Sequence, residues 1–121
     1  MNIERDRYRA ALHSDGILYV EMFGLMSRAD VDQYYPDLAP FDAAMRASHG
    51  RVRTLVDVQM VQPPGVAMYF RQKGISGLNP TDRCAFLVAT MLSKLQIARL
   101  AIDENVGLFT DREKALAWLR E

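Results

Sequence analysis

The segment that most constrains the fold is Thr81–Ala89, TDRCAFLVA, in which apolar side chains occupy successive positions instead of alternate ones. A strand with one buried face alternates apolar and polar side chains, so an uninterrupted apolar run indicates a strand that is buried on both faces. Such strands belong to parallel sheets that carry helices on each side. We therefore expect an α/β fold in which residues 81–89 form a central strand.

The rest of the chain supplies the alternation of strands and helices that this fold needs. Strands are expected at residues 7–13, 16–24, 52–58, 81–89 and 106–109. The first two strands flank Ser14-Asp15-Gly16, and an Asp-Gly pair between strand-like runs predicts an antiparallel hairpin. The later strands are separated by helical patterns, which predicts a mainly parallel sheet with right-handed crossovers. With 121 residues the chain fits one domain, residues 1–121, with about five strands and four helices.

Helix ends and apolar spacing locate the four helices. Ser27 with Asp30, and Thr110 with Glu113, match the capping box that begins a helix. Pro64 suits the first turn of a helix. Apolar residues at helical spacing predict the buried stripes. For the first helix these are Val31, Tyr34, Tyr35, Leu38, Phe41 and Met45; for the third, Met91, Leu95, Ala98 and Ile102; and for the last, Ala115, Trp118 and Leu119.

Two prolines interrupt the first helix pattern. Pro36 and Pro40 each remove a backbone donor and crowd the preceding turn, so we expect this helix to be kinked or split between Tyr35 and Ala39. Tyr34 and Tyr35 lie beside this point. Tyrosine combines apolar area with a polar tip, so the pair is expected to line a crevice or an oligomer contact.

Composition argues against several classes of function. Lys plus Arg equals Asp plus Glu at 15 each, so the basic excess of a nucleic-acid binder is missing. The longest apolar stretches reach about nine residues, against the ~20 that a membrane helix needs, and the N-terminal residues do not resemble a secretory signal. A single cysteine, Cys84, cannot form an internal disulfide and is expected to be a buried thiol. We expect a cytoplasmic protein.

Motifs for metal, nucleotide or hydrolytic chemistry are also missing. The chain contains no HxxxH, CxxC, glycine-rich phosphate loop or GxSxG pattern. His13 ends the first strand and His49 ends the first helix, so both histidines are interpreted as structural or surface residues. We accordingly expect no cofactor, no metal and no catalytic residue.

The junction that follows residues 52–58 is the candidate binding site, because open α/β sheets place ligands at the carboxyl ends of their strands. Asp57 is open to two interpretations, a carboxylate that orients a ligand or one that accepts hydrogen bonds from the turn. The apolar residues of the loop favour a contact surface or a pocket lip. The candidate residues are Asp57, Gln59, Met60, Val61, Gln62, Pro64 and Gly65, with Tyr35 and Tyr69 beside them.

Over residues 7–121 this order of elements resembles the STAS-like fold of sulfate transporters and anti-sigma factor antagonists, in its SpoIIAA-like branch. The resemblance rests on the hairpin with GILYVEMFG, the helix ADVDQYYPDLAPFDAAMRASHG, the strand RTLVDV and the terminal FTDREKALAWLRE. Members of this branch are mostly small bacterial proteins, and their fold is similar to the lipid-binding CRAL-TRIO (Sec14) domain.

In anti-sigma factor antagonists an Asp-Ser-Ser-Gly-like motif after the third strand carries a phosphorylated hydroxyl. Here the segment from Asp57 to Gly65 contains no Ser or Thr, so the resemblance implies a binding module without this switch. We predict a non-enzymatic module that binds a protein partner or itself. One alternative is a carrier or sensor of a small apolar, lipid-like ligand in a cavity around Tyr35, Met60, Val66 and Phe70. Another is an enzyme with Asp57 as general base.

Overall fold

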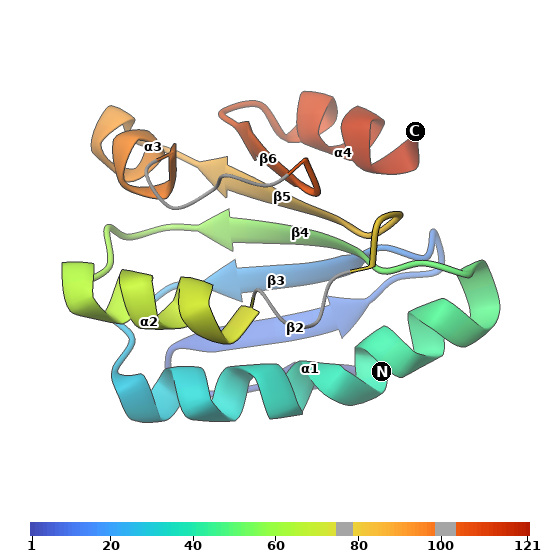
Figure 1. Cartoon of the computed structure of the whole chain (residues 1–121), viewed down its shortest axis with the longest axis horizontal. Coiled ribbons are helices and arrows are strands. Elements are labelled where there is room, and N and C mark those ends of the chain that lie inside the picture. The colour runs from blue at the N-terminus through green and yellow to red at the C-terminus, as the bar shows by residue number, and fades with distance from the viewer. Residues whose placement is uncertain (75–78, 99–103) are drawn as a thin grey trace.

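The computed structural model of the chain describes residues 1–74, 79–98 and 104–121. Within these residues the chain forms six strands and four helices, shown in Figure 1. In chain order they are β1 (Asn2–Glu4), β2 (Tyr8–Leu12), β3 (Leu18–Met22), α1 (Arg28–His49), β4 (Arg53–Val58), α2 (Pro64–Gly74), β5 (Arg83–Val88), α3 (Met91–Ala98), β6 (Val106–Phe109) and α4 (Arg112–Arg120).

The strands form one sheet in the order β1-β2-β3-β4-β5-β6. β2 runs antiparallel to both β1 and β3, and β3, β4, β5 and β6 are parallel to one another. The predicted hairpin joins β2 to β3, and its Gly16 has the positive φ of 82° that such a turn requires. The expected α/β class and mainly parallel sheet are therefore confirmed.

The sheet differs from the sequence prediction at two strands. β1 is a sixth strand, which the pattern does not reveal because its three residues are mostly exposed and show no apolar run. β5 is an internal strand between β4 and β6, but the middle of the sheet is occupied by β3 and β4. Even without β1 the middle strand would be β4, and most residues of β5 are only partly buried, so the apolar run marks an internal strand and not the centre of the sheet.

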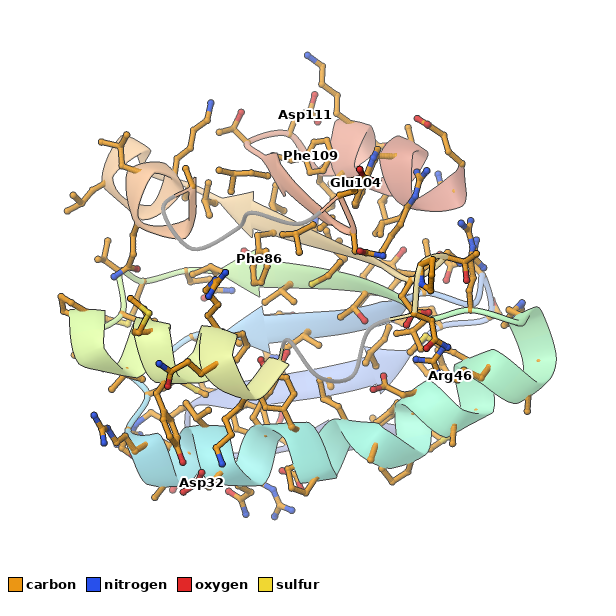
Figure 2. All side chains as sticks on the ribbon, in the orientation of Figure 1. Asp32, Arg46, Phe86, Glu104, Phe109 and Asp111 are labelled. Atoms are coloured by element: carbon orange, nitrogen blue, oxygen red, sulfur yellow. The ribbon has the colours of Figure 1, made fainter. Side chains whose placement is uncertain are left out.

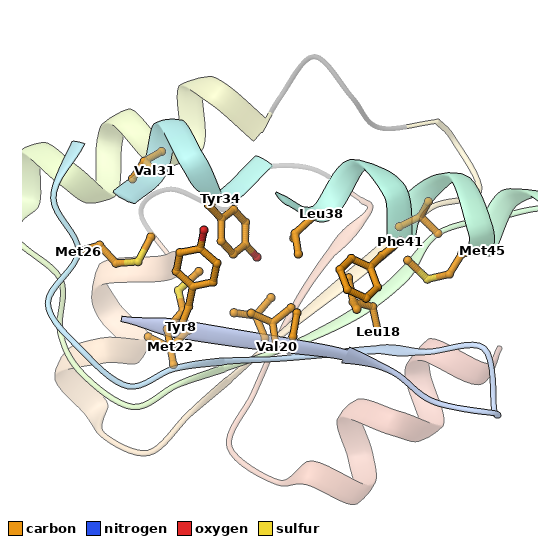
Figure 3. Packing of buried hydrophobic residues seen from close by; sticks show 14 of the residues in the cluster. Tyr8, Leu18, Val20, Met22, Met26, Val31, Tyr34, Leu38, Phe41 and Met45 are labelled. Atoms are coloured by element: carbon orange, nitrogen blue, oxygen red, sulfur yellow. The ribbon is translucent and has the colours of Figure 1, made fainter. Parts of the chain in front are cut away.

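Each face of the sheet has its own core. On the α1/α2 face, the side chains of Leu18, Val20 and Met22 from β3 pack under α1, as Figure 3 shows. On the opposite face, which we call the α4 face, α4 covers a smaller cluster. This cluster consists of Ile17, Leu55, Ala85, Ala115, Leu116 and Leu119. The period of two in the strands assigns alternate residues to the two cores.

Helix α1 is capped at both ends as its sequence predicts. The Ser27 hydroxyl accepts a hydrogen bond from the Asp30 amide, and the Asp30 carboxylate accepts one from the Ser27 amide. At the other end Gly50 has φ 77° and donates its N–H to the Arg46 carbonyl. The buried stripe matches the predicted one except that Tyr35 is only partly buried.

Of the kink or split expected at the prolines of α1, the split is wrong, because the helix is continuous from Arg28 to His49, although its axis bends along its length in Figure 1. Both Pro36 and Pro40 lie on the exposed side. The carbonyls that lose a backbone donor there are those of Asp32 and Pro36, which belong to exposed residues. Water can bond to these carbonyls, so the buried stripe holds the helix together across both prolines.

The start of α4 differs from the prediction by one residue. Asp111, and not Thr110, is the N-cap, and its carboxylate accepts a hydrogen bond from the Glu113 amide at 2.9 Å. Both residue types are good caps, and the end of β6 at Phe109 leaves Thr110 as the connection. Within α4, Ala115 and Leu119 are fully buried as expected, whereas Trp118 of the predicted stripe is only partly buried.

Helix α3 does not bury the predicted stripe. Leu95 is 52% exposed, Leu92 is 64% exposed and Ala98 is exposed as well. Ile102 and the side chain of Met91 lie outside the described residues. Helical spacing shows which residues share a face, but only neighbouring elements decide whether that face is covered.

Candidate ligand-binding cavity

A cavity of about 200 Å³ lies on the α1/α2 face of the sheet. Its described lining comes from β3, β4, β5 and β6, from α1, α2 and α3, and from the loops beside them. The residues are Met22, Met26, Tyr34, Tyr35, Leu38, Asp42, Val52, Thr54, Val56, Val58, Gln62, Val66, Ala67, Phe70, Arg71, Gly74, Arg83, Cys84, Phe86, Gln96 and Val106. Figure 2 labels Phe86, which lies over β4 and β5.

Helix α2 covers the sheet incompletely beside the cavity. This helix has 11 residues, and Ala67 is the only one of them that is fully buried. Val66 and Phe70 are partly buried and pack against the core cluster of this face. The facing strand β4 contributes only side chains of modest size, those of Thr54, Val56 and Val58. A short helix above small strand residues leaves space between them.

Polar groups of the lining lie toward the two ends of the strands. Thr54 is near the beginning of β4, and Asp42 is in the second half of α1, which returns to that end of the sheet. Gln62 and Gln96 follow the carboxyl ends of β4 and β5. Between these ends the wall is mainly apolar. Ligand sites usually have this composition, with a mostly apolar wall and a few fixed polar groups.

Gln62, a predicted site residue, lines the cavity but its side-chain amide is already bonded to the protein. Its Oε1 accepts from the Met26 amide at 2.8 Å, and its Nε2 donates to the Gly24 carbonyl at 3.0 Å. The backbone of Gln62 also bonds the side chain of Gln96 in both directions. Gln62 therefore joins the loops after β3 and β4 to α3, which makes it a structural element of the wall.

Tyr35 also lines the cavity, as does Tyr34, in agreement with the expected crevice. The Tyr35 hydroxyl donates to the Phe70 carbonyl at 2.8 Å, which ties α1 to α2. The ring centroids of Tyr34 and Tyr35 lie 5.0 Å apart in an edge arrangement, and Phe70 packs on both rings. Burial raises the pKa of both tyrosines, so their hydroxyls remain protonated.

Tyr69 lies outside the described lining of the cavity. Its hydroxyl donates to the Asp32 carboxylate, and the cationic groups of Arg28 and Lys73 lie 5.3 Å from its ring centroid. These contacts connect the outer sides of α1 and α2. The structure therefore gives Tyr69 a position between helices instead of one in the cavity.

Asp57 and Gln59 are directed away from the cavity. Because side chains alternate along β4, Asp57 points to the face opposite Val56 and Val58. Its carboxylate accepts a hydrogen bond from Arg112 of α4 at 3.2 Å, and the described residues show no bond from the following turn beside it. Gln59 donates to the Glu21 carboxylate at 3.4 Å. The general-base alternative therefore has no support from the cavity.

The rest of the predicted loop lies at the surface. Met60 is 38% exposed, Pro64 and Gly65 are exposed, and Val61 is partly buried. Within the described lining, none of these four residues is present. The cavity expected around Tyr35, Met60, Val66 and Phe70 thus includes all of these residues but Met60.

Asp42 is the main polar residue of the cavity that the prediction missed. Burial raises its pKa to about 6, although the nearby Arg46 guanidinium opposes this shift and Asp82 adds to it. The sequence does contain a signal for this position. Asp42 follows Leu38 by four residues and precedes Met45 by three, which places a carboxyl in the buried stripe of α1.

Cys84 also lines the cavity. It is partly exposed, and burial together with the nearby Asp42 raises the pKa of its thiol to about 12. The thiolate is the reactive form of cysteine, so this residue is an inert part of the wall near neutral pH.

The described residues also limit other kinds of site. They include no group of three or more His, Cys, Asp or Glu residues that could hold a metal ion. None of the helices in this part of the chain has both the length and the apolar character needed to cross a membrane. His13 stacks on Tyr19 with ring centroids 3.9 Å apart, and His49 is the last residue of α1.

Comparison with known proteins adds the family. A family model described as SpoIIAA-like matches residues 17–120, from the start of β3 through α4. Comparison with curated proteins gave no match, and comparison with solved structures gave none. The family consists generally of non-enzymatic regulatory binding domains. Because the match covers most of the 121 residues and agrees with the observed order of elements, the chain belongs to the SpoIIAA-like family.

Proposed function

We propose that this chain is a non-enzymatic binding module that holds a small apolar ligand in the cavity on the α1/α2 face. The observation that carries the proposal is the volume of about 200 Å³ with a mainly apolar wall. An engineered protein cavity of about 150 Å³ lined by apolar side chains binds benzene. By the same standard, this cavity admits a molecule of about one substituted ring.

With this cavity as support, we put the apolar-ligand alternative ahead of the protein-interaction module that the sequence favours. The loop between β4 and α2 has no hydroxyl that could be phosphorylated, so the proposal includes no phosphorylation switch in this loop. The site residues are those of the wall. Tyr35 and Gln62 come from the predicted binding residues, Val66 and Phe70 from the predicted cavity, and Val56 and Phe86 from the structure.

A variant with a larger side chain in the cavity wall should bind an apolar ligand more weakly than wild type. Val66→Phe adds volume to the wall, so we expect at least tenfold weaker binding of ethylbenzene, a one-ring apolar probe, by ligand-observed NMR. Met68→Phe is the matched control, because Met68 lies on the same helix and is 47% exposed. Native mass spectrometry of the freshly purified protein, with a denatured control, should also reveal a bound small molecule. Equal binding of the probe by wild type and a folded Val66→Phe variant would contradict the proposal.

A second candidate function, contact with a protein partner or a second copy of the chain, has its own observation. Leu25, Met60, Met68, Leu92 and Leu95 are large apolar side chains that are between 38% and 64% exposed. They follow the carboxyl ends of β3, β4 and β5, which are parallel and therefore end at the same edge. We call these five residues the apolar edge. Exposed apolar groups gathered in this way favour a contact surface.

A further inference from the structure

The proposed cavity has a carboxyl group in an otherwise mainly apolar wall. Asp42 lies on α1 and is partly buried, and it is the only acidic residue of the described lining. Carboxylates are rarely placed against apolar surface without a partner, because removal from water disfavours the charged form. The raised pKa of Asp42 reflects this cost. A ligand that donates a hydrogen bond to the Asp42 carboxyl would remove part of this energetic cost.

The charges around Asp42 favour a ligand that donates a hydrogen bond over one that accepts a hydrogen bond. Arg46 donates to both carboxylate oxygens of Asp82, at 3.1 and 2.7 Å, and the Asp82 side chain is fully buried. Asp82 also accepts from the Val52 and Asn79 amides. The three charged groups therefore sum to one net negative charge when Asp42 is ionised. Figure 2 shows Arg46 near the end of the sheet where β5 begins.

Arg71 and Arg83 also line the cavity, and their positions affect the net charge that a ligand meets there. The guanidinium of Arg83 donates to the Trp118 carbonyl at 2.5 Å and lies 4.8 Å from the centroid of the Trp118 ring. Trp118 belongs to α4, on the other face of the sheet, so the charge of Arg83 is directed away from the cavity. Arg71 lies on α2, in the wall that faces the strands. Tighter binding of an anionic probe than of an amine is the competing outcome of the test.

We propose that the ligand is a small amphiphile with one hydrogen-bond donor, an amine or an alcohol, bound at the Asp42 carboxyl. Its apolar part would lie against Val56, Phe70 and Phe86. This inference rests on the proposed function, because it names the chemical class of ligand for the same cavity. The net negative charge beside Asp42 makes the amine the stronger binder of the two.

Four probes of similar size test the assignment at pH 8: 2-phenylethylamine, 2-phenylethanol, ethylbenzene and 3-phenylpropionate. We expect the amine to bind at least fivefold more tightly than ethylbenzene, and the propionate to bind most weakly, by ligand-observed NMR titration. Asp42→Asn should abolish the preference for the amine. Asp6→Asn, a change at an exposed carboxylate in the β1–β2 turn, should retain it.

The pH dependence of wild type tests the same point without a variant. Around Asp42, Arg46 stays charged, the lowered pKa of Asp82 keeps that group charged, and the raised pKa values of Tyr34 and Cys84 keep those groups neutral. Asp42 is thus the member of this group that changes charge between pH 5 and pH 8. The preference for the amine over ethylbenzene should fall as the pH is lowered through about 6.

The outcomes separate the two proposals. The assignment to Asp42 is wrong if ethylbenzene binds and the amine binds no more tightly than ethylbenzene. It is also wrong if a folded Asp42→Asn variant still prefers the amine. In both cases the proposed ligand-binding function is retained. Tighter binding of 3-phenylpropionate than of the amine also overturns the assignment to Asp42. If none of the four probes binds, the proposed function itself fails.

Discussion

At the scale of single residues, the carboxyl groups of Asp42 and Asp82 have opposite environments. Burial by itself raises the pKa of Asp82, but hydrogen bonds from Arg46 and from the Asn79 and Val52 amides outweigh it and lower that pKa. Asp42 lacks comparable backbone donors, and its pKa is raised to about 6. Asp82 therefore stabilises the fold as an ion, whereas ionised Asp42 destabilises it, and a ligand that satisfies Asp42 recovers that stability.

Replacement of Asp42 should stabilise the protein without ligand in a pH-dependent way. Its pKa is raised on folding from 3.8 to about 6, so the folded state is penalised when the group ionises. The loss of stability caused by ionised Asp42 is absent below pH 3.8, grows between pH 3.8 and pH 6, and is complete above pH 6. Asp42→Asn should gain about 1 kcal/mol at pH 8, allowing for partial solvent screening, and nothing at pH 3.5. Thermal unfolding at both pH values measures the difference, with Asp6→Asn as control. A gain independent of pH would contradict this account.

At the scale of elements, the contact between α1 and α2 depends on Gly74. A Cβ built at this residue would lie 2.6 Å from the Tyr35 hydroxyl, and this hydroxyl donates to the Phe70 carbonyl. We expect Gly74→Ala to displace the Tyr35 ring and to lower the free energy of unfolding by about 1–2 kcal/mol in a urea titration. Gly65→Ala is the matched control on the same helix, because a Cβ there meets no atom within 4 Å.

A double variant distinguishes this steric cause from a change in helix propensity. Tyr35→Phe removes the hydroxyl that the new methyl group would meet, although it also removes the hydrogen bond to Phe70. The two changes together should therefore cost less than the sum of the single variants. If the stability losses of the two single variants simply add in the double variant, the alanine at position 74 does not act through the Tyr35 hydroxyl.

At the scale of the whole molecule, the two faces of the sheet are covered to different extents. The α4 face is packed by Ala115, Leu116 and Leu119, whereas the α1/α2 face retains the cavity. The apolar edge adds exposed side chains where the parallel strands end. The formal net charge is zero, so two copies of the chain meet no overall repulsion.

We expect weak self-association through the apolar edge. Light scattering across the micromolar range should show a mass that rises with concentration, and Leu92→Ser with Leu95→Ser should hold the protein at the monomer mass. Both leucines are more than half exposed, so the fold should tolerate the changes. Gln33→Ser, at an exposed position of α1, is the control. A wild-type mass that stays monomeric at every concentration would contradict the prediction and leave this edge for a different protein partner.

Local patterns in the sequence determined most of the fold. The hairpin at Asp15-Gly16 and the capping box of Ser27 act through neighbouring residues, and both are found where they were predicted. The apolar run at residues 81–89 does form a strand, Arg83–Val88, but most of its residues are only partly buried and the strand is not at the centre of the sheet. The cap of α4 differs by one residue because Thr110 and Asp111 are both suitable caps. The split of α1 at Pro36 and Pro40 was wrong because packing along the other side of the helix outweighs a local loss on the exposed side.

The candidate site was decided by the tertiary structure. The loop from Asp57 to Gly65 was predicted from its place after a strand, but strand alternation and the contact with Arg112 turn Asp57 to the opposite face. Whether Leu95 is covered, or whether space remains beside Asp42, depends on helices that are distant in sequence. Sequence patterns report interactions along the chain, whereas a cavity is the volume that several elements together fail to fill. For this reason the sequence alone determined the family of folds, and only the tertiary structure placed a carboxyl in an apolar cavity.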